Sequence, residues 1–255
     1  MTAAGKPKQR ASEAQPPALV LLHGFGLDSR VWRAQVLGLQ DEFRIMTVDL
    51  PGFGAQAREL GEVVPANDLA RAMDVSGLLR AHLVASSYGA AVAIDFALAH
   101  PKRVQSLTLM GPLLLGRRTG IDAWARAVEL ANEGDRATAI EIFLDDPLFE
   151  SIRGDEQLFE EVRQIALDYP AGHWTGKVVT KWLEPEPAKR LGEITAPALV
   201  MSGEADLPSF VLMAEAYAKG LANARREIVQ AAGHLVNMER PELFNEVLRT
   251  FLKTI

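Results

Sequence analysis

The sequence predicts a doubly wound α/β fold with a mostly parallel sheet, and two observations support this class. Six short apolar runs, almost uninterrupted by polar residues, are typical of strands that helices cover on both faces. Longer amphipathic or alanine-rich runs separate most of them, so strands and helices alternate along the chain. The predicted strands are 18–23, 44–49, 82–86, 104–110, 198–202 and 226–230.

Local signals mark the ends of the predicted helices. Asn67 is a suitable N-cap for the first, because its side chain can accept a hydrogen bond from a free backbone N–H. Pro101 follows the second, and the residue before a proline disfavours helical backbone. The other two begin with proline, and Gly220 is expected to end the earlier of them. The predicted helices are 67–80, 88–100, 208–219 and 241–253.

The alternation of strands and helices is interrupted between residues 113 and 190, where no convincing strand is predicted. This segment is rich in aromatic residues and turn signals, which indicates several short helices inserted after strand 104–110. Because open sheets bind ligands at the carboxyl ends of their strands, we expect 113–190 to be a helical cap or lid. The alternative is a helical subdomain that only adds core. The α/β core then comprises 18–112 and 191–255, preceded by a flexible arm, 1–17.

Composition excludes several functional classes. Lys and Arg number 27 against 33 Asp and Glu, and a net charge of −6 offers no basic surface for nucleic acid or for a membrane. The absence of cysteine excludes a disulfide scaffold, a thiolate nucleophile and a cysteine metal site. No apolar run reaches the roughly 18–20 residues of a membrane span, and the N-terminus lacks a signal-peptide core. We expect a cytoplasmic protein, monomeric or homodimeric.

A candidate nucleophile lies in the stretch 82–97, where a buried strand leads through Ser-x-Gly into a helix of small residues. This is the context of a nucleophile elbow, a sharp turn that exposes a serine hydroxyl. The turn requires small residues two positions before and after the nucleophile. Ala85 and Gly89 satisfy this for Ser87, whereas the corresponding neighbours of Ser86 are valine and tyrosine. Ser87 is therefore the predicted nucleophile, although Ala85 replaces the glycine of the usual G-x-S-x-G pattern.

His23 begins a His-Gly-Phe-Gly run directly after the first predicted strand, and Gly24 and Gly26 permit close backbone approach there. With this run the chain resembles the α/β-hydrolase family, whose HGxG segment helps to build the oxyanion hole. The resemblance implies that the backbone N–H groups of Phe25 and Tyr88 hold the oxyanion. His23 is expected to brace the loop through its ring nitrogens rather than to act as a base.

The same resemblance implies a triad acid and a base. The acid follows the strand 198–202, where Asp206 matches the family position and Glu204 is the nearest rival. Some members place the acid after the strand that precedes the cap, but residues 110–112 offer no carboxylate here. The base occupies a Gly-His position, which is His234. The order Ser87, Asp206, His234 is that of nucleophile, acid and base in the family.

The resemblance implies hydrolysis of a small-molecule ester or lactone through an acyl-enzyme, with no metal or organic cofactor. The chain resembles small bacterial carboxylesterases, including pimeloyl-carrier-protein methyl esterases, and enol-lactonases. A carboxylesterase is therefore the first expectation, and a lactonase or carbon–carbon bond hydrolase with the same triad is the alternative. A non-catalytic small-molecule receptor on the same fold stays open. Trp124, Phe143 and Trp174 of the expected cap are the candidate substrate-binding residues.

Overall fold

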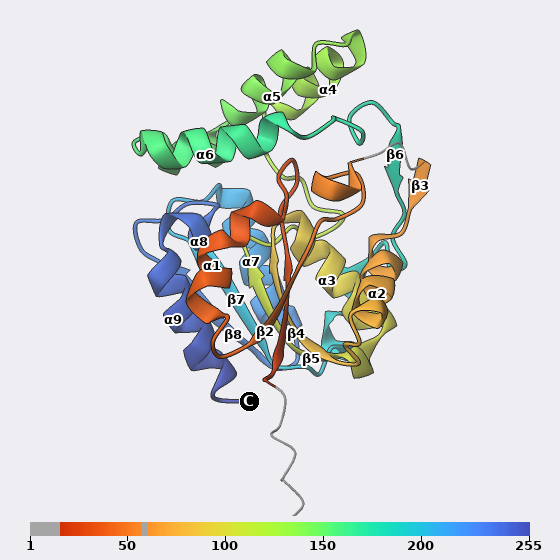
Figure 1. Ribbon diagram of the computed structural model, residues 1–255, viewed down its shortest axis with the longest axis vertical. Coiled ribbons are helices and arrows are strands. Elements are labelled where there is room, and N and C mark those ends of the chain that lie inside the picture. The colour runs from red at the N-terminus through yellow and green to blue at the C-terminus, as the bar shows by residue number, and fades with distance from the viewer. Residues whose placement is uncertain (1–15, 58–60) are drawn as a thin grey trace, which may run out of the picture.

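The computed structural model describes residues 16–57 and 61–255, so the predicted arm 1–17 lies almost wholly outside the described residues. Its main feature is a six-stranded sheet in the order β2-β1-β4-β5-β7-β8, and every neighbouring pair is parallel (Figure 1). This confirms the predicted fold class and each predicted strand to within two residues. The strands are β1 Ala18–Leu22, β2 Arg44–Val48, β4 Ala81–Ser86, β5 Val104–Met110, β7 Ala198–Gly203 and β8 Ala224–Val229.

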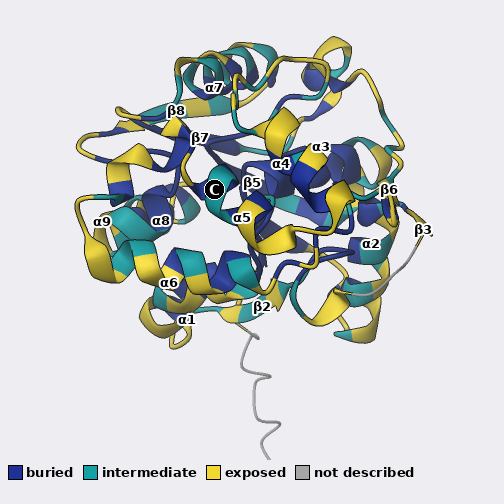
Figure 2. Cartoon of the chain, turned by 90° about the horizontal axis from the view of Figure 1, so that it is seen from above, coloured by how far each residue is buried: buried dark blue, intermediate teal, exposed yellow. Residues whose placement is uncertain are grey.

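Helices cover both faces of this sheet, as Figure 2 shows from above. α1 and α9 pack against each other on one face, and α2 and α3 pack together on the other, where α7 also lies. The central strands are consequently buried along their whole length, as near-continuous apolar runs require. The helices around the sheet are α1 Arg33–Leu39, α2 Pro65–Val75, α3 Tyr88–Ala99, α7 Pro208–Gly220, α8 Val236–Glu239 and α9 Pro241–Leu252. No helix of the described chain is both long and apolar enough to cross a membrane.

The predicted start and end of α2 were wrong. The helix begins at Pro65 with Val64 in the N-cap position, because proline suits the first turn, and Asn67 therefore lies inside the helix. It ends at Val75 rather than at residue 80. Gly77 adopts a φ of 68°, and its N–H donates to the carbonyl of Asp74, a left-handed glycine of the kind that commonly ends a helix.

Two short strands were not predicted, and the expectation of no strand in 113–190 was wrong at one point. β3 (Gly61–Val63) and β6 (Val178–Thr180) pair in parallel and form a separate two-stranded sheet. Each has three residues, too few for an alternating pattern to be recognised. Their pairing joins the segment that follows β2 to the last part of segment 113–190.

Three helices lie above the carboxyl ends of the parallel strands (Figure 1). They are α4 Trp124–Glu133, α5 Arg136–Leu144 and α6 Glu156–Leu167. Asp135 and Asp155 cap the last two by accepting N–H groups of their first turns, and Gly134 ends the first with a φ of 91°. Residues 113–190 thus contain short helices over the strand ends, while their division from the core as a separate lid stays a prediction.

A buried carboxylate on α3 holds the returning chain. Asp95 is fully buried, and its two oxygens accept hydrogen bonds from the N–H groups of Leu183 (3.1 Å) and Glu184 (2.7 Å). Burial raises the pKa of Asp95, although both hydrogen bonds act in the opposite direction. The helix that follows Ser87 is therefore tied directly to the last part of segment 113–190.

Asp95→Ala should destabilise the fold because it leaves two N–H groups without their acceptor. We expect the free energy of unfolding to fall by about 1–3 kcal/mol in chemical denaturation. Asp41→Ala, at an exposed position, is the matched control and should leave the value within about 0.5 kcal/mol. Equal stability of the two variants would contradict this role of Asp95.

Candidate active site

Ser87 lies at the sharp turn between β4 and α3. Its backbone has a φ of 50° and a ψ of −112°, a conformation that L-residues rarely adopt. Hydrogen bonds maintain this conformation, because the N–H of Ser87 donates to Met110 O (2.9 Å) and its carbonyl accepts from Ala90 N (3.0 Å). A Cβ at Gly89 would lie 2.7 Å from the carbonyl oxygen of Leu22, which explains why a small residue is required there.

Asp206 and His234 are brought together from loops that follow β7 and β8. His234 Nδ1 lies 3.0 Å from Asp206 Oδ1 and 3.1 Å from Oδ2, and both side chains are buried. A ring nitrogen facing a carboxylate is the donor, so the pairing assigns the proton to Nδ1 and leaves Nε2 as an acceptor. The rival Glu204 is exposed and accepts instead from the N–H of Ala231 (3.4 Å).

Two glycines make room for this pair. Gly111, at the end of β5, has a φ of 47°, and a Cβ there would lie 2.9 Å from His234 Nδ1 and 3.2 Å from Asp206 Oδ2. A Cβ at Gly203 would lie 2.2 Å from the carbonyl oxygens of Ala232 and Gly233. Side chains at either position would therefore separate the imidazole from the carboxylate.

Ser87 and His234 line the same small cavity, of about 30 Å³, which has room for roughly one water molecule. Asp, Glu, Lys and Arg side chains are absent from its lining among the described residues. Ser86 also lines it, but Ser86 is only 2 % exposed and its buried hydroxyl has no hydrogen-bond partner among the described residues. Within the described chain Ser87 Oγ makes no hydrogen bond to His234, a contact that often tightens only when substrate binds.

The His-Gly-Phe-Gly loop borders the cavity and is braced as predicted. His23 Nδ1 donates to Gly24 O (2.7 Å), and Nε2 accepts from the N–H of Leu50 (2.9 Å). Complete burial lowers the pKa of His23, so the ring stays neutral in this role. The N–H groups of Phe25 and Tyr88 have no hydrogen-bond partner among the described residues, and Phe25 lines the cavity.

Aromatic residues from the segment 113–190 cover the cavity around Phe25. Its ring centroid lies 4.8 Å from that of Trp124, 6.2 Å from that of Phe143 and 5.9 Å from that of Trp174. Trp124 and Phe143 line the cavity, whereas Trp174 packs behind them, 5.5 Å from Phe143. The further lining residues Ile121, Leu148 and Phe149 were not predicted, and only the aromatic character of Phe149 gave any signal.

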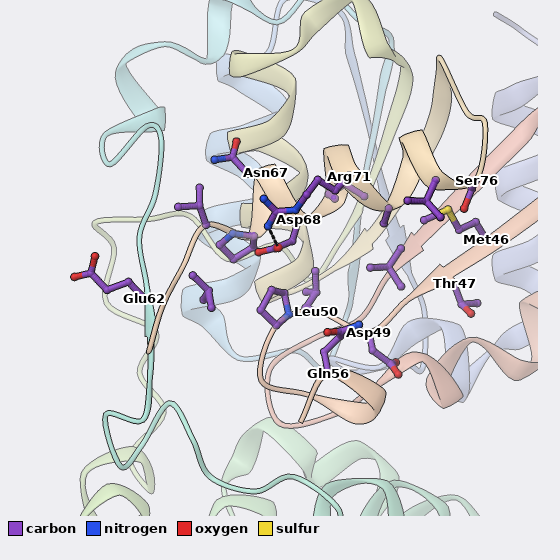
Figure 3. A pocket seen from close by; sticks show the side chains of 18 residues that line it. Met46, Thr47, Asp49, Leu50, Gln56, Glu62, Asn67, Asp68, Arg71 and Ser76 are labelled. Atoms are coloured by element: carbon purple, nitrogen blue, oxygen red, sulfur yellow. Dashed lines mark hydrogen bonds and ion pairs between the residues drawn. The ribbon is translucent and has the colours of Figure 1, made fainter. Parts of the chain in front are cut away.

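A groove larger than this cavity lies elsewhere in the described structure. It has a volume of about 770 Å³ and is lined by Met46 and Thr47 of β2 and by Asp68 and Arg71 of α2, which form an ion pair (Figure 3). None of Ser87, Asp206 and His234 lines it. Its described lining contains no histidine beside a serine, so the chemistry suited to acyl transfer lies in the smaller cavity. Nowhere in the described chain do three or more His, Asp or Glu side chains form a metal site.

Comparison with known proteins gives consistent matches over nearly the whole chain. The model of the alpha/beta hydrolase family matches residues 19–247. The 2-hydroxy-6-oxononadienedioate/2-hydroxy-6-oxononatrienedioate hydrolase of Paraburkholderia phymatum is 31% identical over 92% of this chain and 86% of that protein. The pimeloyl-[acyl-carrier protein] methyl ester esterase of Aeromonas hydrophila is 28% identical over 93% and 96%. The structure of a thermophilic esterase from Thermogutta terrifontis superposes with a TM-score of 0.80, at 28% identity over 94% and 90%.

Ser87→Gly should stabilise the protein because glycine adopts the observed backbone conformation without steric cost. We expect its free energy of unfolding to exceed that of the wild type by about 1 kcal/mol in chemical denaturation. Ser87→Ala, which retains the Cβ and hence the strain, serves as the control. A glycine variant no more stable than the alanine variant would contradict strain at this turn.

His173 should make the stability depend on pH. Its ring stacks on Phe53 at 4.5 Å, and burial lowers its pKa to about 4. Between about pH 6.5 and pH 4 the unfolded chain therefore binds a proton on this histidine that the folded chain does not bind. Because of this difference, the free energy of unfolding decreases as the pH falls from about 6.5 to about 4. His173→Phe should reduce this acid loss by about 2 kcal/mol, measured as unfolding free energy at several pH values. Parallel curves for variant and wild type would contradict the expectation.

Proposed function

We propose that this chain, which belongs to the alpha/beta hydrolase family, is a serine hydrolase that cleaves carboxylic esters through Ser87, His234 and Asp206. The observation that carries the proposal is the hydrogen bond between His234 and Asp206 beside the cavity that Ser87 also lines. A nucleophile, a base and an acid that orients the base are the groups that acyl transfer requires.

In the proposed reaction His234 Nε2 takes the proton of Ser87 Oγ as the oxygen attacks the ester carbonyl carbon. Asp206 keeps the proton of the neutral ring on Nδ1 and stabilises the imidazolium that forms. His234 then protonates the leaving alcohol, and an acyl group stays on Ser87. A water molecule, deprotonated by His234, attacks this acyl-enzyme, releases the carboxylic acid and restores Ser87.

The negative charge of each tetrahedral intermediate is proposed to be held by the backbone N–H groups of Phe25 and Tyr88. Both donors lack a partner within the described chain, and fixed donors of this kind are worth several kcal/mol to the transition state. Their position supports the role, since Tyr88 directly follows Ser87 and Gly24 packs against the side chain of Ser87. A Cβ at Gly24 would lie 3.4 Å from that of Ser87.

The lining of the cavity supports an ester with a small apolar acyl group. Trp124 and Phe143 would contact this group, and Trp174 would support them from behind. A dioate, the substrate class in the name of one relative, offers carboxylates that no Lys or Arg of the described lining would pair. A lactonase or carbon–carbon bond hydrolase is the second candidate, because a relative named 3-oxoadipate enol-lactonase and one named 2-hydroxy-6-oxononadienedioate/2-hydroxy-6-oxononatrienedioate hydrolase match over most of the chain.

Ester hydrolysis by the purified protein tests this proposal. The wild type should hydrolyse p-nitrophenyl acetate and butyrate, and Ser87→Ala, His234→Ala and Asp206→Asn should each lower kcat by about 10³–10⁴-fold. A fluorophosphonate probe should label Ser87, and it should still do so in Ser86→Ala. If the wild type is no faster than Ser87→Ala on any activated ester or lactone and Ser87 is not labelled, a non-catalytic receptor is favoured instead.

A further inference from the structure

The position of His234 depends on a loop between β8 and α8. Within this loop the Asp206 carboxylate hydrogen-bonds only the ring of His234, so it orients the imidazole but leaves the backbone of the loop to other contacts. The loop has unusual backbone, because Ala231 adopts a φ of 51°. Contacts that hold the loop consequently decide how far Nε2 lies from Ser87 Oγ.

Glu239, at the end of α8, holds the loop on both sides of His234. Its Oε2 accepts a hydrogen bond from the N–H of Gly233 (2.8 Å), and its Oε1 accepts one from the N–H of Leu235 (3.0 Å). One carboxylate therefore brackets His234 through the residues before and after it. Hydrogen bonds to an ionised acceptor are shorter and stronger than neutral ones, which suits a contact that must hold a loop.

Other contacts hold the loop but do not bracket His234. Arg240 Nε donates to the carbonyl oxygen of Ala231 (3.0 Å), three residues before the histidine. The N–H of Ala205 donates to the carbonyl oxygen of Ala232 (2.9 Å), which joins the loop to the neighbour of Asp206. Among the described residues, Glu239 is the side chain that contacts both flanking amides.

We propose that Glu239 is a positioning residue for His234, and this inference rests on the proposed serine hydrolase function. It keeps the imidazole in reach of Ser87 by fixing the backbone, whereas Asp206 fixes the ring. Glu239 does not line the cavity, so its loss affects the chemical step more than substrate binding. A misplacement of about 1 Å in a catalytic group lowers the rate by about 100-fold, which sets the scale of the effect.

Kinetics of Glu239→Ala and Glu239→Gln on p-nitrophenyl butyrate test this role. We expect kcat of the alanine variant to fall by about 30–100-fold with KM within about threefold. The glutamine variant should retain more activity than the alanine variant, because its amide oxygen still accepts a hydrogen bond from one backbone N–H. Its NH₂ group can only donate, so it cannot replace the hydrogen bond to the other N–H. The rate of fluorophosphonate labelling of Ser87, measured on folded protein, should fall in parallel. Glu242→Gln, at an exposed position of α9, is the control and should behave as the wild type.

Amide hydrogen exchange of Gly233 and Leu235, measured by NMR, tests the two hydrogen bonds to Glu239 without relying on catalysis. Exchange at both amides should be at least tenfold faster in Glu239→Ala than in the wild type. An unchanged kcat, or unchanged exchange at both amides, would overturn the inference while the proposed function stands. A fall in activity that tracks only a lower folded fraction would also overturn it. A wild type without hydrolysis or labelling would instead remove the proposed function itself, whatever the exchange shows.

Discussion

The hydrogen bond between His234 and Asp206 requires two loops, far apart in the sequence, to meet at one edge of the sheet. Parallel strands place all their carboxyl ends at that edge, and β7 and β8 are neighbours there. The approach is close enough that a side chain at Gly203 or Gly111 would occupy the space of the loops or of the ring itself. Ser87 reaches the same edge from β4 through a strained turn. The site therefore depends on the parallel orientation of the strands and on glycines, which have no side chain to fill the space between the loops.

Aromatic and aliphatic side chains enclose the site. The rings around Phe25 and the residues of segment 113–190 that line the cavity leave room for about one water molecule. The proposed ester substrate is larger, so its binding would require side chains of the covering segment to move. Trp124, 36% exposed, is the least buried of the aromatic lining residues. The Arg30–Asp168 ion pair (2.7 Å) and the buried Asp95 tie this segment to the core at other points.

Sequence patterns predicted the features that depend on residues close together in the chain, such as the strands and the turn at Ser87. Buried strands are marked by their apolar runs, and the choice of Ser87 over Ser86 followed from small neighbours, which the approach of Gly89 to the β1 backbone now explains. The start of α2 and the short pair β3–β6 were missed because proline placement and tertiary pairing outweighed local preference. Glu239 could not be predicted, since a carboxylate that holds backbone amides of a folded loop leaves no repeating pattern.

The central claim is that Ser87 carries the acyl group during turnover. Mass spectrometry of acid-quenched reactions with p-nitrophenyl butyrate tests it most directly, by locating the acyl group on the chain. The account predicts a mass increase of one butyryl group on the peptide containing Ser87, rising with the initial burst of p-nitrophenol and absent in Ser87→Ala. Steady turnover with the acyl group on another residue, or with no acylated chain under conditions that show a burst, would contradict it.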